Sequence, residues 1–150
     1  MKRVLQFLTE YIDQGVIESK VSPLENAFLS DDCFDGVPNE PGIYIMVAKK
    51  RKFVYPTKDS PVFYIGTSKH LRSRLKTHLC RFKEAKKDFK NHKLWNYSRY
   101  NYAVAFGADI YYMRITGREN EKALESKAME GFYDKYGALP VGNGAFSFRI

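Results

Sequence analysis

Residues 41–78 read PGIYIMVAKKRKFVYPTKDSPVFYIGTSKHLRSRLKTH, and this stretch decides the fold. Its two apolar runs, 43–47 and 62–65, are rich in the β-branched and aromatic residues that favour strands. A connector with four adjacent cations and two prolines joins the runs. After Gly66 the leucines recur at helical spacing, in a segment rich in Lys and Arg. The stretch therefore predicts a β-hairpin that leads directly into a basic helix beginning near Lys69.

The forty residues before the hairpin indicate one helix and a connector. Apolar side chains over residues 2–16 recur at the spacing of an amphipathic helix, which we expect to pack on the core. Residues 18–41 hold prolines, a glycine and a Ser-Asp-Asp cluster, a composition typical of a connector. We therefore divide the chain into an N-terminal helix with its connector, residues 1–40, and a main domain, residues 41–150, in one compact unit.

Beyond the basic helix, a strand is expected at residues 108–115 and a helix at 117–136, opened by the capping-box pattern from Thr116 to Glu119. Residues 93–106 fit either a short helix or an extended segment, and 145–149 fit a short closing strand. The predicted fold class is α+β, with a small central three-stranded antiparallel sheet flanked by helices.

The net charge of +8 is unevenly distributed. Residues 68–100 carry eleven Lys or Arg against two acidic residues, or +9, whereas the remaining fourteen basic and fifteen acidic residues sum to −1. Aromatic residues are interleaved with these cations. This pattern favours nucleic acid as the partner over the alternative of a merely solvated helix face. The candidate nucleic-acid contacts are Lys69, Arg72, Lys76, Arg81, Lys83, Lys86, Lys87, Lys90 and Lys93.

Composition also bears on the compartment. The two cysteines, Cys33 and Cys80, form no Cys-x-x-Cys pair, which argues against a zinc site or a disulfide framework. No apolar run approaches the length of a membrane span, and Glu10 and Asp13 interrupt the start of the chain in a way that signal peptides avoid. We expect a soluble cytoplasmic protein with no membrane partner.

Several short motifs follow one another in an informative order. Gly42-Ile43-Tyr44 precedes Tyr64-Ile65-Gly66, and Arg74 follows ten residues after the second tyrosine. Ala123-Leu124-Glu125 and Pro140-Val141-Gly142-Asn143 come later. Over residues 41–143 this ordered set resembles the GIY-YIG nuclease superfamily, although the connector between the two tripeptides is longer than in that family. The resemblance implies the GIY-YIG fold, with an extra N-terminal helix in this chain.

The resemblance also implies a metal-dependent DNA endonuclease. Glu125 would hold one Mg²⁺ or Mn²⁺ ion per active site, with waters and phosphate completing its shell. Either Tyr44 or Tyr64 would be the general base, the other orienting water or phosphate, and Arg74 would contact phosphate. His78, one helical turn beyond Arg74, would contact phosphate or the phenol. The full candidate catalytic set is Tyr44, Tyr64, Arg74, His78, Glu125 and Asn143.

Two enzymatic interpretations stay open on the sequence: a restriction-like or mobile-element enzyme, and a structure-specific repair nuclease. A cut through both strands with one site per chain requires a homodimer or two sequential nicks. The non-enzymatic alternative is a nucleic-acid-binding module that keeps the fold without turnover. Taken singly, each residue also has an ordinary explanation, since strand tyrosines often belong to the core and Asn143 lies in a glycine-rich turn.

Overall fold

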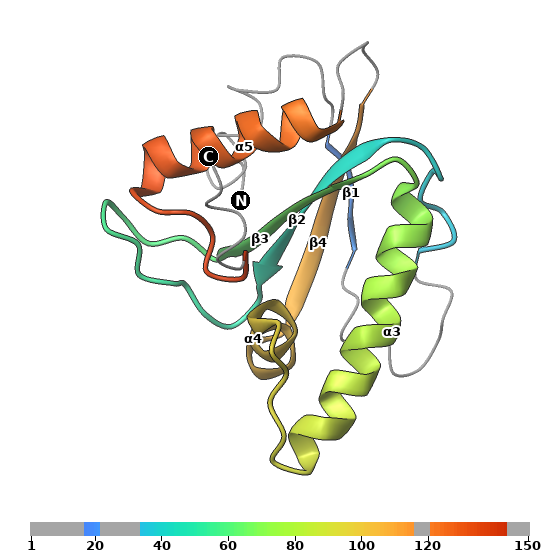
Figure 1. Ribbon diagram of the computed structural model, residues 1–150, viewed down its shortest axis with the longest axis vertical. Coiled ribbons are helices and arrows are strands. Elements are labelled where there is room, and N and C mark those ends of the chain that lie inside the picture. The colour runs from blue at the N-terminus through green and yellow to red at the C-terminus, as the bar shows by residue number, and fades with distance from the viewer. Residues whose placement is uncertain (1–16, 22–33, 116–120, 144–150) are drawn as a thin grey trace.

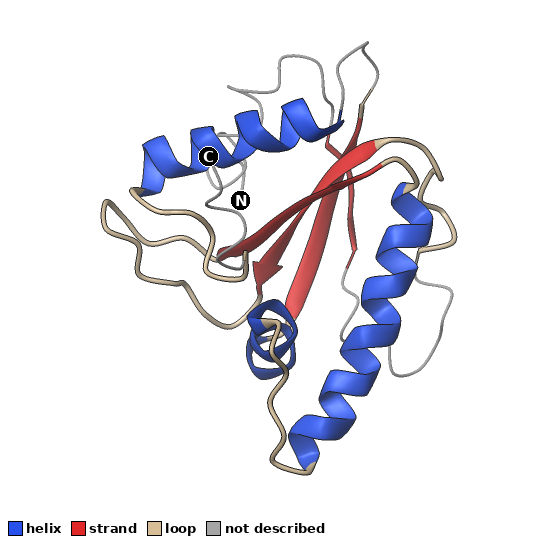
Figure 2. Ribbon diagram, viewed as in Figure 1, coloured by secondary structure: helices blue, strands red, loops and turns tan. Residues whose placement is uncertain are grey.

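The computed structural model describes residues 17–21, 34–115 and 121–143 of the chain. Figures 1 and 2 show strands and helices arranged around one antiparallel sheet. The elements in chain order are β1 (Ile17–Val21), β2 (Gly42–Ala48), β3 (Val62–Ser68), α3 (Leu71–Lys90), α4 (Ser98–Phe106), β4 (Ala108–Arg114) and α5 (Glu121–Tyr136). The predicted α+β class, with an antiparallel sheet flanked by helices, is confirmed.

The hairpin supplies a central strand, β2, and an edge strand, β3, of the sheet. The strand order is β1-β4-β2-β3, and every neighbouring pair is antiparallel. β2 is paired on both edges and is buried along its whole length, which explains why its sequence is almost entirely apolar. In Figure 1 the strands run between α5 and α3. α5 packs on β2 and β3, whereas α3 and α4 pack on each other and on β3.

The sheet contains one strand more than the sequence predicts. β1 pairs with β4, and most of β1 lies in the segment 18–41 that composition assigns to a connector, so that assignment is wrong for residues 18–21. Its sequence, IESKV, has three polar residues between two apolar ones and lacks the β-branched run that marks the other strands. The predicted helix over residues 2–16, the capping box at 116–119 and the closing strand at 145–149 lie outside the described residues.

The long connector of the hairpin folds back onto the core. Phe53 pairs with Ser60 through backbone hydrogen bonds of 2.8 and 3.0 Å, and its ring packs edge-on against Tyr102 and Phe106 of α4. Two of the four adjacent cations are also engaged: Lys49 lies 3.6 Å from Asp109, and Arg51 lies over the Phe106 ring. Much of the connector therefore packs against the rest of the domain.

α4 settles the segment whose conformation the sequence leaves open. Residues 98–106 are helical, and the positive φ of Gly107, 72°, lets the chain leave the helix and enter β4 at once. α4 thereby lies beside α3. Among the described residues, no helix combines the length and the apolar character needed to cross a bilayer.

Candidate active site

The core of the candidate site is Tyr44, whose side chain lies in a space that a glycine leaves open. Tyr44 on β2 stands opposite Gly66 on β3. A Cβ atom at position 66 would come within 2.5 Å of the Tyr44 hydroxyl and 2.9 Å of the Tyr64 ring. Any side chain larger than hydrogen would therefore displace the phenol, which gives a physical reason for glycine after Tyr64-Ile65.

His78 meets the Tyr44 phenol from α3. The Tyr44 hydroxyl and His78 Nε2 share a hydrogen bond of 2.6 Å, and both residues are almost fully buried. Helical spacing places Arg74 one turn before His78, on the same flank of α3. The guanidinium of Arg74 acts on the Tyr44 phenol by charge and by hydrogen bonding. The hairpin and the basic helix thus bring together three of the residues that the sequence selects.

Tyr100, from α4, joins Tyr44, Tyr64 and His78 in a group that we call the tyrosine cluster. Its hydroxyl lies 2.9 Å from His78 Nδ1, so both ring nitrogens of this histidine are hydrogen-bonded to phenols. Phe82 stacks on the imidazole from the next turn of α3. The motif pattern does not select Tyr100, because its role depends on how α4 packs against α3. The sequence signal available was only its place among the aromatic residues of the basic segment.

Tyr64 forms the outer part of the cluster. Its ring centroid lies 6.1 Å from that of Tyr44 and 5.9 Å from that of His78, and its side chain is 9% exposed against 1% for Tyr44. Arg99 of α4 places its guanidinium 4.8 Å from the Tyr64 ring centroid. Arg99 Nε is buried and has no hydrogen-bond partner among the described residues. A second cation that sequence analysis counted only as charge therefore lies beside a motif tyrosine.

The electrostatics of this cluster keep its two central groups uncharged near neutral pH. Burial, reinforced by the neighbouring Tyr64, raises the pKa of the Tyr44 phenol well above its usual range, although Arg74 acts in the opposite direction. Burial also holds the pKa of His78 well below its usual range, with Arg74, Arg99 and Arg81 adding to the effect. The resting cluster is therefore a neutral phenol hydrogen-bonded to a neutral imidazole.

Glu125 lies at the end of the hairpin, next to Thr67. The Thr67 hydroxyl donates to Glu125 Oε2 over 3.2 Å. Side chains alternate along β3, so Thr67 and Tyr64 point to opposite faces of that strand. Glu125 thus approaches the hairpin from the α5 side. Arg74 acts electrostatically on both the Glu125 carboxylate and the Tyr44 phenol, and it favours the ionised form of each.

Glu125 is half-buried, and this burial affects the pKa of its carboxyl group. Burial raises the pKa of Glu125 above its usual range, against the opposing effects of the Thr67 hydroxyl, Lys122 and Arg74. Within the described part of the chain, no three His, Cys, Asp or Glu side chains are grouped as a metal site. Mg²⁺ is commonly held by one or two carboxylates together with waters and substrate phosphates. A half-buried carboxylate beside a hydroxyl fits such a single-carboxylate site.

Asn143 is committed to the edge of the sheet. Its Oδ1 accepts a hydrogen bond from the Ile65 amide over 3.0 Å, and its Nδ2 donates to the Ile65 carbonyl over 2.9 Å. The side chain thus pairs with β3 as the backbone of a further strand would. Ile65 directly follows Tyr64, so the position of Asn143 fits a residue that holds the second tyrosine in place.

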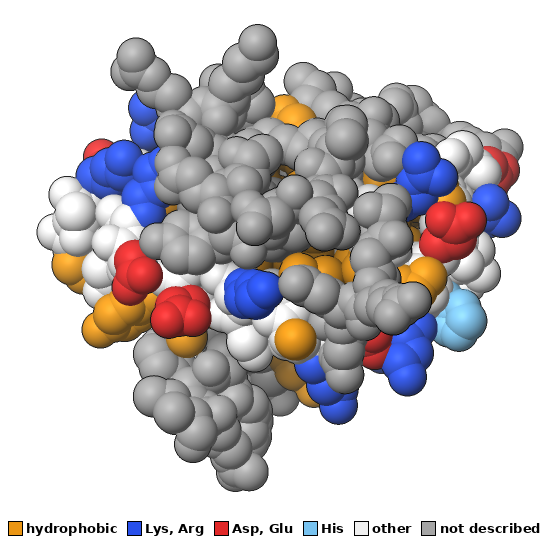
Figure 3. Space-filling view, turned by 90° about the horizontal axis from the view of Figure 1, so that it is seen from above, with side chains coloured by type: hydrophobic (Ala, Val, Ile, Leu, Met, Phe, Trp, Pro, Cys, Tyr) orange, Lys and Arg blue, Asp and Glu red, His pale blue; other side chains and the backbone are white. Residues whose placement is uncertain are grey.

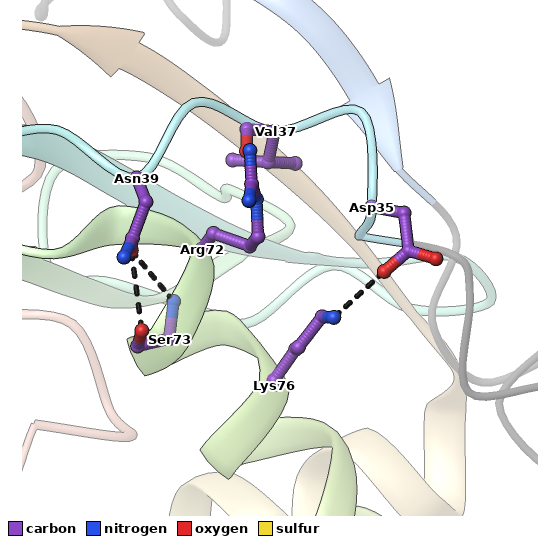
Figure 4. A network of polar contacts seen from close by, with 6 residues as sticks. All are labelled: Asp35, Val37, Asn39, Arg72, Ser73 and Lys76. Atoms are coloured by element: carbon purple, nitrogen blue, oxygen red, sulfur yellow. Dashed lines mark hydrogen bonds and ion pairs between the residues drawn. The ribbon is translucent and has the colours of Figure 1, made fainter.

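The predicted nucleic-acid contacts of α3 are divided between two flanks. Arg81 lies two turns beyond Arg74 and faces the tyrosine cluster, where it acts on both His78 and Tyr100. The opposite flank meets residues 34–40: Arg72 Nε donates to the Val37 carbonyl over 2.6 Å, and Lys76 lies 2.7 Å from Asp35 (Figure 4). Helical spacing places on this second flank Arg72, Lys76, Lys83, Lys87 and Lys90.

The remaining predicted contacts, Lys69, Lys86 and Lys93, lie in three different settings. Lys69 lies 3.8 Å from Glu121 of α5, Lys86 is half-buried, and Lys93 follows α3 in an exposed loop. On the face drawn in Figure 3, Lys and Arg side chains alternate with Asp and Glu. The charge surplus of the sequence is therefore distributed around α3 instead of being gathered on its site-facing flank.

Comparisons of the chain with protein-family models, with curated proteins and with solved structures found no match.

Proposed function

We propose that the chain is a metal-dependent DNA endonuclease of the GIY-YIG type, which hydrolyses phosphodiester bonds. The observation that carries the proposal is the buried hydrogen bond between Tyr44 and His78, with the Arg74 guanidinium at the same phenol. Structural tyrosines do not need a histidine base and an arginine at one hydroxyl. Hydrolysis does need a group that can lose a proton and regain it from water.

Tyr44 is the general base in this proposal. A tyrosine with its reference pKa of about 10 is a poor base near neutral pH, and burial of Tyr44 makes its ionisation harder still. Two neighbours offset this cost: His78 Nε2 is in position to accept the proton, and Arg74 stabilises the phenolate. Together, His78 and Arg74 would allow the buried Tyr44 phenol to act as a base without a permanent negative charge.

Arg74 and Tyr64 would bind the phosphate. The Arg74 guanidinium acts electrostatically on both the Tyr44 phenol and the Glu125 carboxylate, so a phosphate that it binds would interact with both groups. Arginine suits this role because its planar guanidinium can contact two phosphate oxygens together. Tyr64, at the edge of the cluster and beneath Arg99, would orient the phosphate or the attacking water.

Glu125 would hold the one Mg²⁺ or Mn²⁺ ion. When bound, such an ion supplies Lewis-acid stabilisation of charge on the phosphate and on the leaving 3′-oxygen. The Thr67 hydroxyl fixes the carboxylate of Glu125 beside the end of β3. Lys69 extends the positive charge on that side of the hairpin.

The competing candidate is a nucleic-acid-binding module without turnover. Two observations favour it: both Oδ1 and Nδ2 of Asn143 are hydrogen-bonded to the Ile65 backbone, and Glu125 contacts Thr67 instead of the tyrosine cluster. In that case Arg74 and Arg99 would serve only to bind phosphate. Restriction-like and structure-specific cleavage both remain compatible with the endonuclease proposal, as does a homodimer.

One cleavage assay separates these candidates. Supercoiled, linear and branched DNA are incubated with Mg²⁺ or Mn²⁺ and with the wild type, Glu125→Gln or Glu130→Gln. Glu130 is exposed on the same helix and provides the matched control. We expect cleavage by the wild type and by Glu130→Gln, loss of at least about 100-fold in Glu125→Gln, and binding by all three. Binding by the wild type without cleavage of any substrate would overturn the enzymatic proposal.

A further inference from the structure

The hydrogen bond between His78 and Tyr100 adds a residue that the motif set does not contain. Tyr100 comes from α4, its side chain is 1% exposed, and its hydroxyl lies 2.9 Å from His78 Nδ1. On the other side of the ring, Nε2 lies 2.6 Å from the Tyr44 hydroxyl. A fully buried imidazole is thus held between two buried phenols from different elements.

The position of one proton decides what this arrangement can do. A neutral imidazole carries a proton on one ring nitrogen and accepts at the other. If Nδ1 carries the proton, it donates to the Tyr100 oxygen, and Nε2 accepts from the Tyr44 hydroxyl. If Nε2 carries the proton, both hydrogen bonds reverse, and His78 cannot take a proton from Tyr44.

We propose that Tyr100 is a positioning residue that keeps the ring proton of His78 on Nδ1, which leaves Nε2 ready to accept the Tyr44 proton. The inference rests on the proposed function, in which Tyr44 acts as base. The step is a single proton transfer: the Tyr44 hydroxyl loses a proton, His78 Nε2 gains it, and a phenolate–imidazolium pair results. A third group that fixes the tautomer of a histidine base is a recurring device in enzymes.

The charged and titratable groups around His78 make this transfer depend on bound polyanion. The imidazole faces Tyr44 from β2, Tyr64 from β3, Arg74 and Arg81 from α3, and Arg99 and Tyr100 from α4. The three guanidinium groups oppose the formation of an imidazolium. Phosphates bound beside them offset that opposition, so proton transfer is favoured when DNA occupies the site and disfavoured when it does not.

Tyr100→Phe tests the inference because it removes one hydroxyl and retains the ring. The ring of Tyr100 packs against Phe82 and Trp95, contacts that phenylalanine would keep. Tyr102→Phe is the matched control: it lies on the same helix, and its ring packs against Phe53 and Phe63. Imidazole ¹⁵N NMR reports the tautomer, with the His78 signals identified by their loss in His78→Gln.

We expect the wild type and Tyr102→Phe to show the Nδ1–H tautomer, and Tyr100→Phe to show a substantial Nε2–H population. In DNA cleavage, kcat of Tyr100→Phe should fall about 10- to 100-fold, with KM for DNA unchanged, because Tyr100 is buried and touches no substrate. An unchanged tautomer, or an unchanged kcat in an active enzyme, overturns the inference. If the wild type cleaves no DNA but the tautomer shifts in Tyr100→Phe, the proposed function fails while the assignment of Tyr100 to the ring proton stands.

Discussion

His78 combines complete burial with three nearby cations, and this has a consequence for stability. Its pKa in the folded protein lies well below the value of about 6.5 for an unfolded chain. As the pH falls through 6.5, the unfolded state binds a proton that the folded state does not, so the free energy of unfolding decreases. Above pH 6.5 neither state is protonated at this residue, and the effect disappears.

We therefore predict that lowering the pH from 7.5 to 5.5 reduces the stability of the wild type by an amount that approaches about 1.4 kcal/mol per pH unit below 6.5. His78→Gln should lose this part of the pH dependence, whereas His92→Gln, at an exposed position, should keep it. Urea unfolding at a series of pH values measures the slopes. Equal slopes for the wild type and His78→Gln would contradict the burial of a neutral imidazole.

Only some residues of the site could be placed relative to one another from the sequence. Arg74 and His78 could be predicted as neighbours because a spacing of four on one helix fixes their common flank. Tyr44 and Gly66 could be assigned to adjacent strands because both lie in the hairpin, but their pairing depends on a register that the long connector does not fix. Tyr100 and Arg99 could not be placed, since their contacts depend on the packing of α4 against α3, which leaves no local signal in the chain.

At the scale of the elements, the hairpin depends on Gly66 for the close approach of its two tyrosines. Gly66→Ala would place a methyl group within 2.5 Å of the Tyr44 hydroxyl, so the phenol must move. We expect a loss of stability of about 1–3 kcal/mol together with a loss of cleavage. Gly36→Ala is the control, because a Cβ there meets no atom within 4 Å. A crystal structure of Gly66→Ala with the Tyr44–His78 hydrogen bond intact would contradict this explanation.

Asn143 forms hydrogen bonds with the backbone amide and carbonyl of Ile65 in the edge strand β3. Asn143→Ala would leave the amide and the carbonyl of Ile65 unpaired at a buried position. An unsatisfied buried polar group costs about 1–3 kcal/mol, so we predict a loss of a few kcal/mol and faster hydrogen exchange at the Ile65 amide. Asn91→Ala removes only an exposed hydrogen bond at the end of α3 and should have little effect. Unchanged exchange at Ile65 in Asn143→Ala would show that β3 does not need this side chain.

The elements differ in how well the sequence indicates them. β2, β3 and β4 follow from β-branched and aromatic runs. β1 could not be predicted, since IESKV has no such run and its strand conformation depends on the backbone of β4. Similarly, the motif pattern marked Asn143 but could not show that its amide would pair with β3.

At the scale of the whole molecule, the cations on the two flanks of α3 should contribute differently to the salt dependence of DNA binding. Arg81 shares the flank of Arg74, whereas Lys87 lies on the flank that faces residues 34–40. Each phosphate contact contributes about −0.9 to the slope of log affinity against log salt concentration. Arg81→Gln should reduce that slope by about one contact, and Lys87→Gln should change it less. Salt titration of DNA binding measures both, and a larger effect of Lys87→Gln would assign the DNA to the other flank.

We propose that the tyrosine cluster and Glu125 form one site that directs water to a phosphodiester. Cleavage of DNA in H₂¹⁸O with Mg²⁺, followed by mass spectrometry of the products, tests it most directly. We expect one ¹⁸O atom in the new terminal phosphate with the wild type, and no cleavage above background with Tyr44→Phe. Product without ¹⁸O, or equal cleavage by Tyr44→Phe, would contradict it.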